Sequence, residues 1–238
     1  MKRAVVLAGG RGTRLAPYTV VFPKPLMPLG DTPILEIVLR QLRRCGFTDV
    51  TLAVGHLAEL IEAYFGDGAR FGVRLAYSRE DEPLGTAGPL ALVEGLTEPF
   101  LVMNGDVLST LDYGAFLEAH VAAGASASIA TFTRCNRIDF GVVLADDDGR
   151  VTGYDEKPSS DYLVSTGVYA FSPDVLSHIE PGSYLDFPDL ILRLLSRGAG
   201  VRSSPFDGFW LDIGRHDDFA LAQSEFETRR AEFLGDEQ

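Results

Sequence analysis

The feature that most limits the fold of this chain is the alternation of short β-rich runs with helical patterns over its first 133 residues. Parallel strands need a crossover of about a dozen residues, and a helix usually forms it. We expect strands at residues 3–7, 50–54, 73–77, 100–103 and 126–133. We expect helices at residues 33–45, 57–65, 86–96 and 113–123. The pattern predicts an α/β protein, a Rossmann-like three-layer α/β/α sandwich around a mixed, mostly parallel central sheet.

The first predicted helix has both a start signal and a stop signal. Thr32 is a good N-cap residue, and Pro33 suits the first helical position because its ring already holds a helical φ. Gly46 stands where a C′ glycine belongs. The apolar side chains between these signals recur at helical spacing, at Ile34, Ile37, Val38 and Leu42.

The pattern changes after about residue 133, where strands follow one another without helices between them. We expect strands at 140–144, 151–155 and 163–171, with an exposed hairpin turn at 146–149, and then helices at 187–196 and 217–233. No linker or repeat divides the chain, so we predict a single domain over residues 1–238. We expect one lobe at about 1–108, a second at about 109–215, a C-terminal helix at about 216–234, and a seam near 107–111.

The charge balance argues against a nucleic-acid partner. The 238 residues include 21 Lys and Arg and 34 Asp and Glu, which gives a net charge of −13. Such a negative field repels a phosphate backbone, although a small anion can still bind in a local basic pocket. No run of the sequence approaches the roughly 18 apolar residues of a membrane span. We therefore expect neither a nucleic-acid nor a membrane partner.

The cysteines and the N-terminus indicate the compartment. Cys45 and Cys135 lack the short spacing of a zinc or redox site. The first apolar run stops at Gly9, which is too early for the apolar core of a secretory signal. Two free thiols fit a reducing cytosol, so we expect a cytoplasmic protein.

A glycine-rich segment, Leu7-Ala8-Gly9-Gly10-Arg11-Gly12-Thr13-Arg14-Leu15, follows the first predicted strand directly. Glycines leave backbone N–H groups free to face an anion without a Cβ in the way. Arg14 adds a planar pair of donors suited to phosphate oxygens. The segment lacks the third glycine of the dinucleotide motif and the Lys-Ser/Thr of the P-loop. It predicts either a phosphate-binding loop or simply a turn after a strand.

A stiff segment with a lysine at its centre comes next. Pro23 and Pro25 flank Lys24 and exclude a regular helix there, so the lysine is presented by a restricted backbone. Such a lysine suits an oxyanion near the glycine-rich segment. The alternative is a proline-rich connector whose lysine is solvated.

Together these two segments resemble the signature of the sugar-1-phosphate nucleotidylyltransferases. Four further segments match that family in the same order, at residues 82–88, 104–106, 156–158 and 210–214. Six such motifs in order, between residue 3 and about residue 220, make a specific match although each alone is weak. Within the family the chain is most similar to mannose-1-phosphate and heptose-1-phosphate guanylyltransferases. The resemblance implies the nucleotide-diphospho-sugar transferase fold.

The resemblance also implies a reaction. A sugar 1-phosphate attacks the α-phosphorus of a nucleoside triphosphate, and pyrophosphate leaves. Several negative charges meet in this step, so positioning and charge neutralisation dominate catalysis. The family implies Mg²⁺ as the cofactor, with Asp106 and Asp212 as its ligands. It implies as catalytic residues Arg14, Lys24, Asp106 and Lys157.

The same resemblance divides the binding residues between a nucleotide-binding lobe and a sugar-phosphate lobe. The nucleotide would contact Leu7, Ala8, Gly9, Gly10, Gly12, Thr13, Arg14, Lys24, Glu80, Gly85 and Thr86. The sugar 1-phosphate would contact Asn104, Gly141, Glu156, Lys157, Thr166 and Gly167. Many relatives have an asparagine where this chain has Ser165, so the usual amide contact to the sugar is not expected here.

The base is indicated by three acidic residues, Glu80, Asp81 and Glu82, which precede Gly85 in the segment that reads the base in this family. Guanine presents two donors on one edge, N1–H and the N2 amino group, and a carboxylate can accept from both. We therefore expect GTP, with Glu80 as the acceptor. The alternative is a solvated acidic loop and an enzyme that uses dTTP or UTP with glucose 1-phosphate.

Another alternative is a non-catalytic homologue that senses nucleotide sugars. Such relatives tend to lose residues of the phosphate loop, whereas this chain has all four expected charged residues, Arg14, Lys24, Asp106 and Asp212, which favours an enzyme. Many relatives also continue into a β-helix of hexapeptide repeats that forms oligomer contacts. This sequence ends at Gln238, so we do not expect those contacts, and the sequence leaves open whether the protein is a homo-oligomer.

Overall fold

The computed structural model of the chain describes residues 1–235 and has one central sheet of seven strands. The strands lie in the order β12-β8-β11-β6-β1-β4-β5. All their pairings are parallel except the two that β11 makes with β6 and β8. The predicted mixed, mostly parallel sheet is therefore confirmed. The bounds are β1 (Lys2–Leu7), β4 (Phe47–Val54), β5 (Arg74–Arg79), β6 (Phe100–Asn104), β8 (Ala127–Arg137), β11 (Ser159–Phe171) and β12 (Val201–Pro205).

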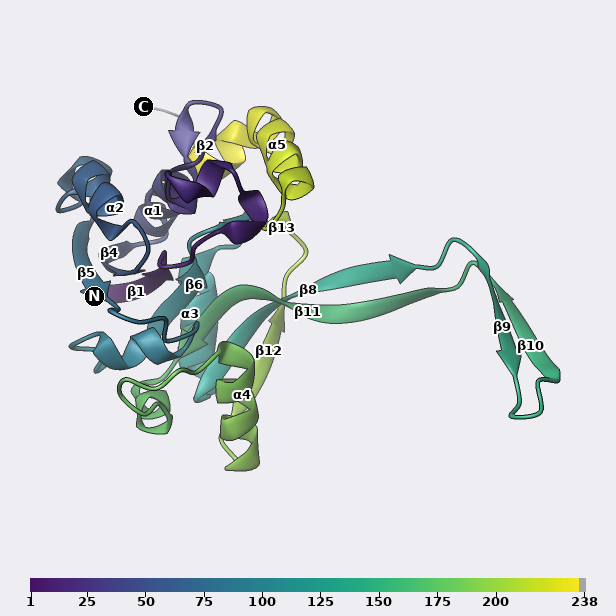
Figure 1. Ribbon diagram of the computed structural model, residues 1–238. Coiled ribbons are helices and arrows are strands. Elements are labelled where there is room, and N and C mark those ends of the chain that lie inside the picture. Colours follow the sequence, from purple (N-terminus) through teal and green to yellow (C-terminus); the bar gives the residue numbers. More distant parts are fainter. Residues whose placement is uncertain (236–238) are drawn as a thin grey trace.

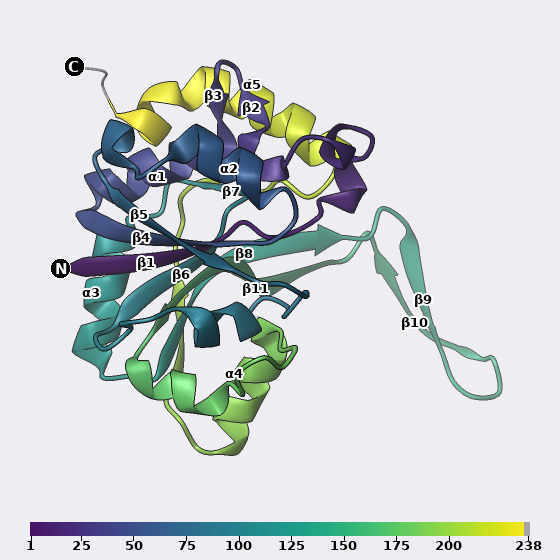
Figure 2. The ribbon, with the colours of Figure 1, turned by 60° about the vertical axis from the view of Figure 1, so that its left-hand side comes forward.

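Helices cover both faces of this sheet (Figures 1 and 2). One face packs against α1 (Ile34–Arg44), α2 (Ala58–Phe65) and α3 (Tyr113–Ala123). The other packs against α4 (Phe187–Ser196) and short 3₁₀ helices. Successive residues of β1 point to opposite faces, so Ala4 and Val6 join the first core and Val5 joins the second. The predicted three-layer sandwich is present, and the sheet is continuous across the expected seam.

The fifth helix, α5 (His216–Leu234), lies outside α1 and forms a third core with it. Its buried side chains are Ala222, Phe226 and Phe233. This core also holds the segment that follows β1, including Leu15 and the short strands β2 (Pro28–Leu29) and β3 (Thr32–Pro33). α5 therefore shares a buried core with Leu15, the last residue of the glycine-rich segment, and supports that segment.

Two local predictions are wrong. Thr32 is not an N-cap: it lies in β3, its hydroxyl donates to Asp31, and Pro33 occupies the N-cap position of α1. The helix predicted over 86–96 is also absent, and only a 3₁₀ helix, Gly88–Leu92, forms there. The reason lies in tertiary hydrogen bonds. The N–H groups of Ala87 and Gly88 donate to the carbonyl of Leu185, so they do not enter a local helix.

The most prominent feature is an arm that leaves the body (Figures 1 and 2). β8 and β11 continue past the sheet as a two-stranded ladder, and β9 (Gly141–Ala145) and β10 (Val151–Glu156) form a hairpin at its far end. The predicted turn at 146–149 closes that hairpin, where Asp146 accepts hydrogen bonds from the N–H groups of Asp148 and Arg150. We call residues 133–163 the arm. Among the described residues, no helix is long and apolar enough to cross a membrane.

Candidate active site

A cavity of about 710 Å³ opens at the carboxyl ends of β1, β4 and β6. Open α/β sheets bind ligands at this edge, because the loops that follow the strands diverge there. Every residue expected to contact the nucleotide lines the cavity, and so do Asn104 and Asp106. The lining also includes Arg11, so three cationic side chains (Arg11, Arg14 and Lys24) gather in a molecule of net charge −13.

The glycine-rich segment forms a loop along one wall of this cavity. Gly12 has a left-handed backbone with φ of +59°, which glycine adopts without strain. Its carbonyl accepts a hydrogen bond of 2.7 Å from the Thr19 hydroxyl, and a Cβ at Gly12 would lie 3.0 Å from the methyl group of Thr19. The loop then enters a 3₁₀ helix, Thr13–Leu15, that carries Arg14. Loop and helix are thus held as the phosphate-binding interpretation requires.

Lys24 and Asp106 form an ion pair at the mouth of the cavity. Lys24 begins a 3₁₀ helix, Lys24–Leu26, and its side chain is only 9% exposed. Asp106 follows β6 through Gly105, whose N–H donates to the carbonyl of Leu7 at the end of β1. One carboxylate oxygen of Asp106, Oδ2, pairs with Lys24, whereas Oδ1 is buried and has no hydrogen-bond partner. A buried, unpaired carboxylate oxygen is costly and marks a position that a ligand can satisfy.

Asp212 reaches the same place from the other end of the chain. β13 (Trp210–Asp212) pairs antiparallel with β7 (Val107–Ser109), in a register that puts Asp212 opposite Val107. The N–H of Ile213 donates to the carbonyl of Asp106. Burial, together with the nearby negative charge of Asp106, raises the pKa of Asp212, and the charges of Lys24 and Arg14 counteract this rise. Three charged groups predicted from the sequence, those of Arg14, Lys24 and Asp106, therefore all act on the pKa of the fourth, Asp212.

These two carboxylates fit a magnesium ion. Mg²⁺ in phosphate-transfer sites is held by one or two carboxylates, with phosphate oxygens and water completing its shell. Asp106 offers the unpartnered Oδ1, and Asp212 offers a second carboxylate, whose pKa is raised first by burial and then by the charge of Asp106. The described residues contain no cluster of three or more His, Cys, Asp or Glu side chains that could hold a metal ion.

The segment expected to read the base is folded by contacts with a distant loop. Asp186 Oδ1 accepts hydrogen bonds from the backbone N–H of Thr86 at 2.9 Å and from its hydroxyl at 3.1 Å. The Thr86 hydroxyl in turn accepts from the N–H of Phe187. Gly85 has φ of +78° and packs so tightly that a Cβ would lie 2.6 Å from the carbonyl oxygen of Leu185. The segment is thus locked to the start of α4.

Glu80 faces inward beneath the glycine-rich loop. Its Oε2 accepts a 3.0 Å hydrogen bond from the N–H of Leu84, and its Oε1 lies where a Cβ on Gly9 or Gly55 would fall. Asp81 and Glu82 also line the cavity but are exposed. Glu80 therefore shapes the segment that would hold the base, besides presenting an acceptor to the cavity.

The residues expected to bind the sugar 1-phosphate lie in two separate places, the body and the arm. Asn104 lines the cavity, and Gly167 lies so close to its amide that a Cβ would be 2.7 Å from Nδ2. The Thr166 hydroxyl is buried and donates to the carbonyl of Ala130, so it is not free for a sugar. Three others lie on the arm, away from the cavity of their own chain: Gly141, Glu156 and Lys157.

The profile of the family "Nucleotidyl transferase" matches residues 3–229, which is nearly the whole chain. The chain belongs to this family. It is 37% identical to a UTP–glucose-1-phosphate uridylyltransferase of Synechocystis and 36% identical to the catalytic subunit beta of a mannose-1-phosphate guanylyltransferase of Drosophila melanogaster, and each match covers 91% of the chain. A putative glucose-1-phosphate thymidylyltransferase from Bacillus anthracis has the same fold, with a TM-score of 0.77 and 25% identity over 100% of this chain and 97% of the other.

The nucleotidyl transferase spans 61% of the length of the Synechocystis relative and 60% of the Drosophila one. The relatives also differ in base, since one is a uridylyltransferase and the other a guanylyltransferase. Similarity over the shared region therefore identifies the family and leaves the base to be argued from the site.

The cavity residues of this nucleotidyl transferase that the sequence did not indicate include Tyr184 and Asp186. Asp186 precedes Phe187-Pro188 and has the pattern of an N-cap, which is a signal for a helix start and not for a ligand site. Its side chain makes no capping bond and instead holds Thr86. The Tyr184 hydroxyl donates to Asp186 Oδ2 at 2.7 Å. Only the fold brings Asp186 into contact with Thr86, which lies a hundred positions earlier in the chain.

Proposed function

We propose that this nucleotidyl transferase condenses a nucleoside triphosphate with a sugar 1-phosphate and releases pyrophosphate. The observation that supports this most directly is the convergence of Arg14, Lys24, Asp106 and Asp212 beside a glycine-lined cavity. Two cations and two carboxylates at the carboxyl edge of the sheet suit a reaction in which highly charged phosphates must meet.

In the proposed reaction, a phosphate oxygen of the sugar 1-phosphate bonds to the α-phosphorus, and the bond from that phosphorus to the bridging oxygen of the β-phosphate breaks. Free N–H groups of the glycine-rich loop and the guanidinium of Arg14 hold the triphosphate. Lys24 neutralises charge that grows on the departing pyrophosphate. Bound Mg²⁺, held by Asp106 and Asp212, would withdraw charge from the phosphate oxygens. The chain mainly aligns and neutralises the reactants.

The sugar 1-phosphate is proposed to bind between the cavity and the β9–β10 hairpin. Asn104 and the close-packed backbone at Gly167 form the side that belongs to the body. Glu156 would accept hydrogen bonds from sugar hydroxyls, Lys157 would neutralise the attacking phosphate, and backbone at Gly141 would border the sugar. Lys157 has a left-handed backbone, with φ of +49°, at the corner between β10 and β11. Such a strained non-glycine residue fits a functional position.

For the base we propose guanine, which makes GTP the preferred nucleotide. The support is an acidic wall, because Glu80, Asp81 and Glu82 all line the cavity beside Gly85. A carboxylate accepts from both guanine donors, whereas a pyrimidine presents one N3–H between two carbonyls. The second candidate is UTP with glucose 1-phosphate, which the 37% identity to a uridylyltransferase favours.

The test is a matrix of nucleoside triphosphates against mannose, heptose and glucose 1-phosphates, scored by pyrophosphate release in the presence of Mg²⁺. We expect GTP with mannose or heptose 1-phosphate to give the highest kcat/KM. Release no faster than the background with every pair would refute the reaction. A similar kcat/KM for GTP and UTP would refute only the choice of base.

Glu80→Gln tests the guanine contact separately. Glutamine keeps one side-chain oxygen for the N–H of Leu84 but puts an amide donor in place of Oε1, the acceptor that remains for the base. A lost or mismatched hydrogen bond costs about 1–3 kcal/mol, so the ratio of kcat/KM for GTP to that for UTP should fall about tenfold or more. Glu98→Gln, at an exposed position that does not line the cavity, is the control and should leave this ratio unchanged.

A further inference from the structure

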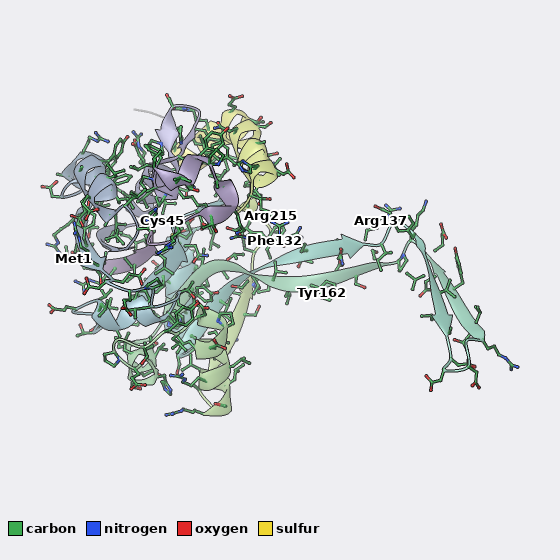
Figure 3. The ribbon with its side chains drawn as sticks, viewed as in Figure 1. Met1, Cys45, Phe132, Arg137, Tyr162 and Arg215 are labelled. Carbon is green, nitrogen blue, oxygen red and sulfur yellow. The ribbon has the colours of Figure 1, made fainter. Side chains whose placement is uncertain are left out.

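The arm exposes an unusual amount of apolar side chain. Its ladder and hairpin project from the body (Figures 1 and 2), and Figure 3 shows Tyr162 along the ladder and Arg137 at its far end. Phe140 is 78% exposed and Leu163 is 59% exposed. Exposed large hydrophobic residues within the arm are Ile138, Phe140, Val143, Leu144, Val151, Tyr154, Tyr162 and Leu163.

The exposed apolar side chains lie on both faces of the arm, because consecutive residues of a strand, such as Tyr162 and Leu163, point to opposite faces. With about 150–250 Å² for an aromatic side chain and somewhat less for an aliphatic one, the arm exposes roughly 800 Å² of apolar surface, about half of it on each face. Each face is thus comparable to the largest apolar patch of a typical soluble monomer, about 300–600 Å², a size that often marks a binding surface. If one face of each arm and an equal area of the partner's surface are buried, the two contacts together bury the ~1,600 Å² of a standard protein interface. The arm therefore has the surface of one half of a dimer contact.

The arm cannot cover the cavity of its own chain without breaking its ladder. β8 and β11 pair without a break from Thr131 with Ser165 out to Arg137 with Ser159. The N–H of Ile138 then donates to the carbonyl of Pro158, which continues the pairing to the hairpin. A return of the hairpin to its own body would need a sharp bend in this paired region. A second chain can meet the arm as it stands.

The body has an apolar groove on the side from which the arm leaves. A second cavity, of about 780 Å³, is lined mainly by apolar residues that include Tyr18, Val21, Phe22 and Phe219. The segment after β1, which carries the first three, lies on the arm's side of the body in both views (Figures 1 and 2). It follows the glycine-rich loop directly, so the groove lies beside the wall of the nucleotide cavity. The groove is thus placed to receive an apolar arm next to the site.

We propose that two copies of this chain exchange arms across a two-fold axis. The apolar side chains of each arm pack into the groove at Tyr18, Val21 and Phe22 of the partner, and its hairpin closes the partner's nucleotide cavity. Lys157 and Glu156 of one copy then serve the site of the other. This last step rests on the proposed function, because it uses the role given there to Lys157. The contact is self-complementary, as a two-fold interface requires.

Sedimentation tests the exchange without reference to catalysis. We expect the wild-type chain to sediment at twice its 25.8 kDa mass. Phe140→Asp and Leu163→Asp should each give monomers with unchanged melting temperature, because both side chains are exposed within the chain itself. Leu195→Asp, at a similarly exposed leucine on α4, is the control and should stay dimeric. A monomeric wild type, or dimers that survive both arm substitutions, would overturn the proposal.

Complementation tests whether the arm serves the partner. Asp106→Asn disables the cavity and Lys157→Ala disables the arm, and each variant alone should be inactive. Random pairing after unfolding and refolding together makes half of the dimers mixed, and each mixed dimer has one complete site. About a quarter of wild-type activity should therefore return. No recovery from a verified mixture of dimers would show that each arm serves its own chain, and would overturn the exchange.

A second arm variant covers the case in which Lys157→Ala remains active. Residues 138–158 can be replaced by Asn-Gly, because the flanking pair, Arg137 and Ser159, face each other in the ladder and a two-residue turn can join them. This variant should be monomeric by itself. Mixed with Asp106→Asn, whose arm is intact, it should regain activity only if the arms exchange, and this activity should rise with the concentration of Asp106→Asn because a single arm must hold the mixed dimer. If the wild type shows no activity with any substrate pair, the proposed function fails, and sedimentation alone decides the exchange.

Discussion

Gly85→Ala probes the lock between the base-reading segment and the start of α4. The new Cβ would lie 2.6 Å from the carbonyl oxygen of Leu185 and 2.9 Å from Asp186 Oδ1. Both atoms belong to groups that hold the segment: the Leu185 carbonyl accepts from Ala87 and Gly88, and Asp186 accepts from Thr86. The backbone φ of +78° adds a penalty for any residue with a side chain.

The size of the effect follows from these contacts. A left-handed alanine costs roughly 1–2 kcal/mol, and displacing two hydrogen bonds costs about 0.5–1.5 kcal/mol each. We expect the free energy of unfolding to fall by about 2–5 kcal/mol in total. Because the segment also borders the nucleotide, we expect KM for the nucleoside triphosphate to rise about tenfold, with a smaller change in kcat.

Gly198→Ala is the matched control. Gly198 has φ of +74° and no atom within 4 Å of the position a Cβ would take, so it has the backbone penalty without the contact. Urea unfolding of both variants should show Gly85→Ala to be the less stable by about 1–3 kcal/mol. Equal losses of stability in the two variants, or an unchanged KM in Gly85→Ala, would refute the claim that this contact holds the segment.

Three further predictions concern the charged site and a buried histidine. Asp106→Asn and Asp212→Asn should each lower kcat at least a hundredfold with an unchanged circular dichroism spectrum, and near-normal turnover in either variant would exclude that residue as a metal ligand. Arg14→Lys should lower kcat/KM about tenfold to a hundredfold, because a lysine cannot make the paired hydrogen bonds of a guanidinium; kinetics equal to wild type would remove Arg14 from the phosphate site. Burial lowers the pKa of His120, which lies between the hydroxyls of Ser128 and Ser172, so the unfolded chain takes up a proton first on acidification. Stability in urea should therefore fall as pH drops below 6.5, and His120→Gln should weaken that dependence; parallel pH profiles would contradict it.

The elements that could be predicted from the sequence are those with strong local signals. β1 and β6 are continuous apolar runs buried on both faces, and such runs form the middle of a parallel sheet. α1 was located by its apolar spacing and by Gly46, which has φ of +88° as the stop signal requires. The glycine-rich loop and Lys24 were identified because glycines leave backbone N–H groups free to face an anion, and because the flanking prolines restrict the backbone that presents the lysine.

The elements that could not be predicted depend on partners far away in the chain. Residues 86–96 have a helical pattern, but the N–H groups of Ala87 and Gly88 donate to the carbonyl of Leu185. Nothing in the local sequence indicates that partner. The arm is a similar case. Apolar and polar residues alternate along a strand in the same way whether the strand ends at the edge of a sheet or continues into solvent. The sequence therefore predicted β9 and β10 but not their distance from the cavity.

The candidate site contains both kinds of residue: those placed by local sequence signals and those placed only by distant partners. Asp106 follows a strand that the sequence locates, and its place at the carboxyl edge of the sheet follows from the fold class. Asp212 has no such local reason, because its position comes from three residues of β13 that pair with β7 across a hundred positions of chain. The two carboxylates are thus held near each other by a short ladder, and the charge of Asp106 helps to raise the pKa of Asp212. The ladder joins residues from both predicted lobes, so it couples the placement of the carboxylates to the packing of one lobe on the other.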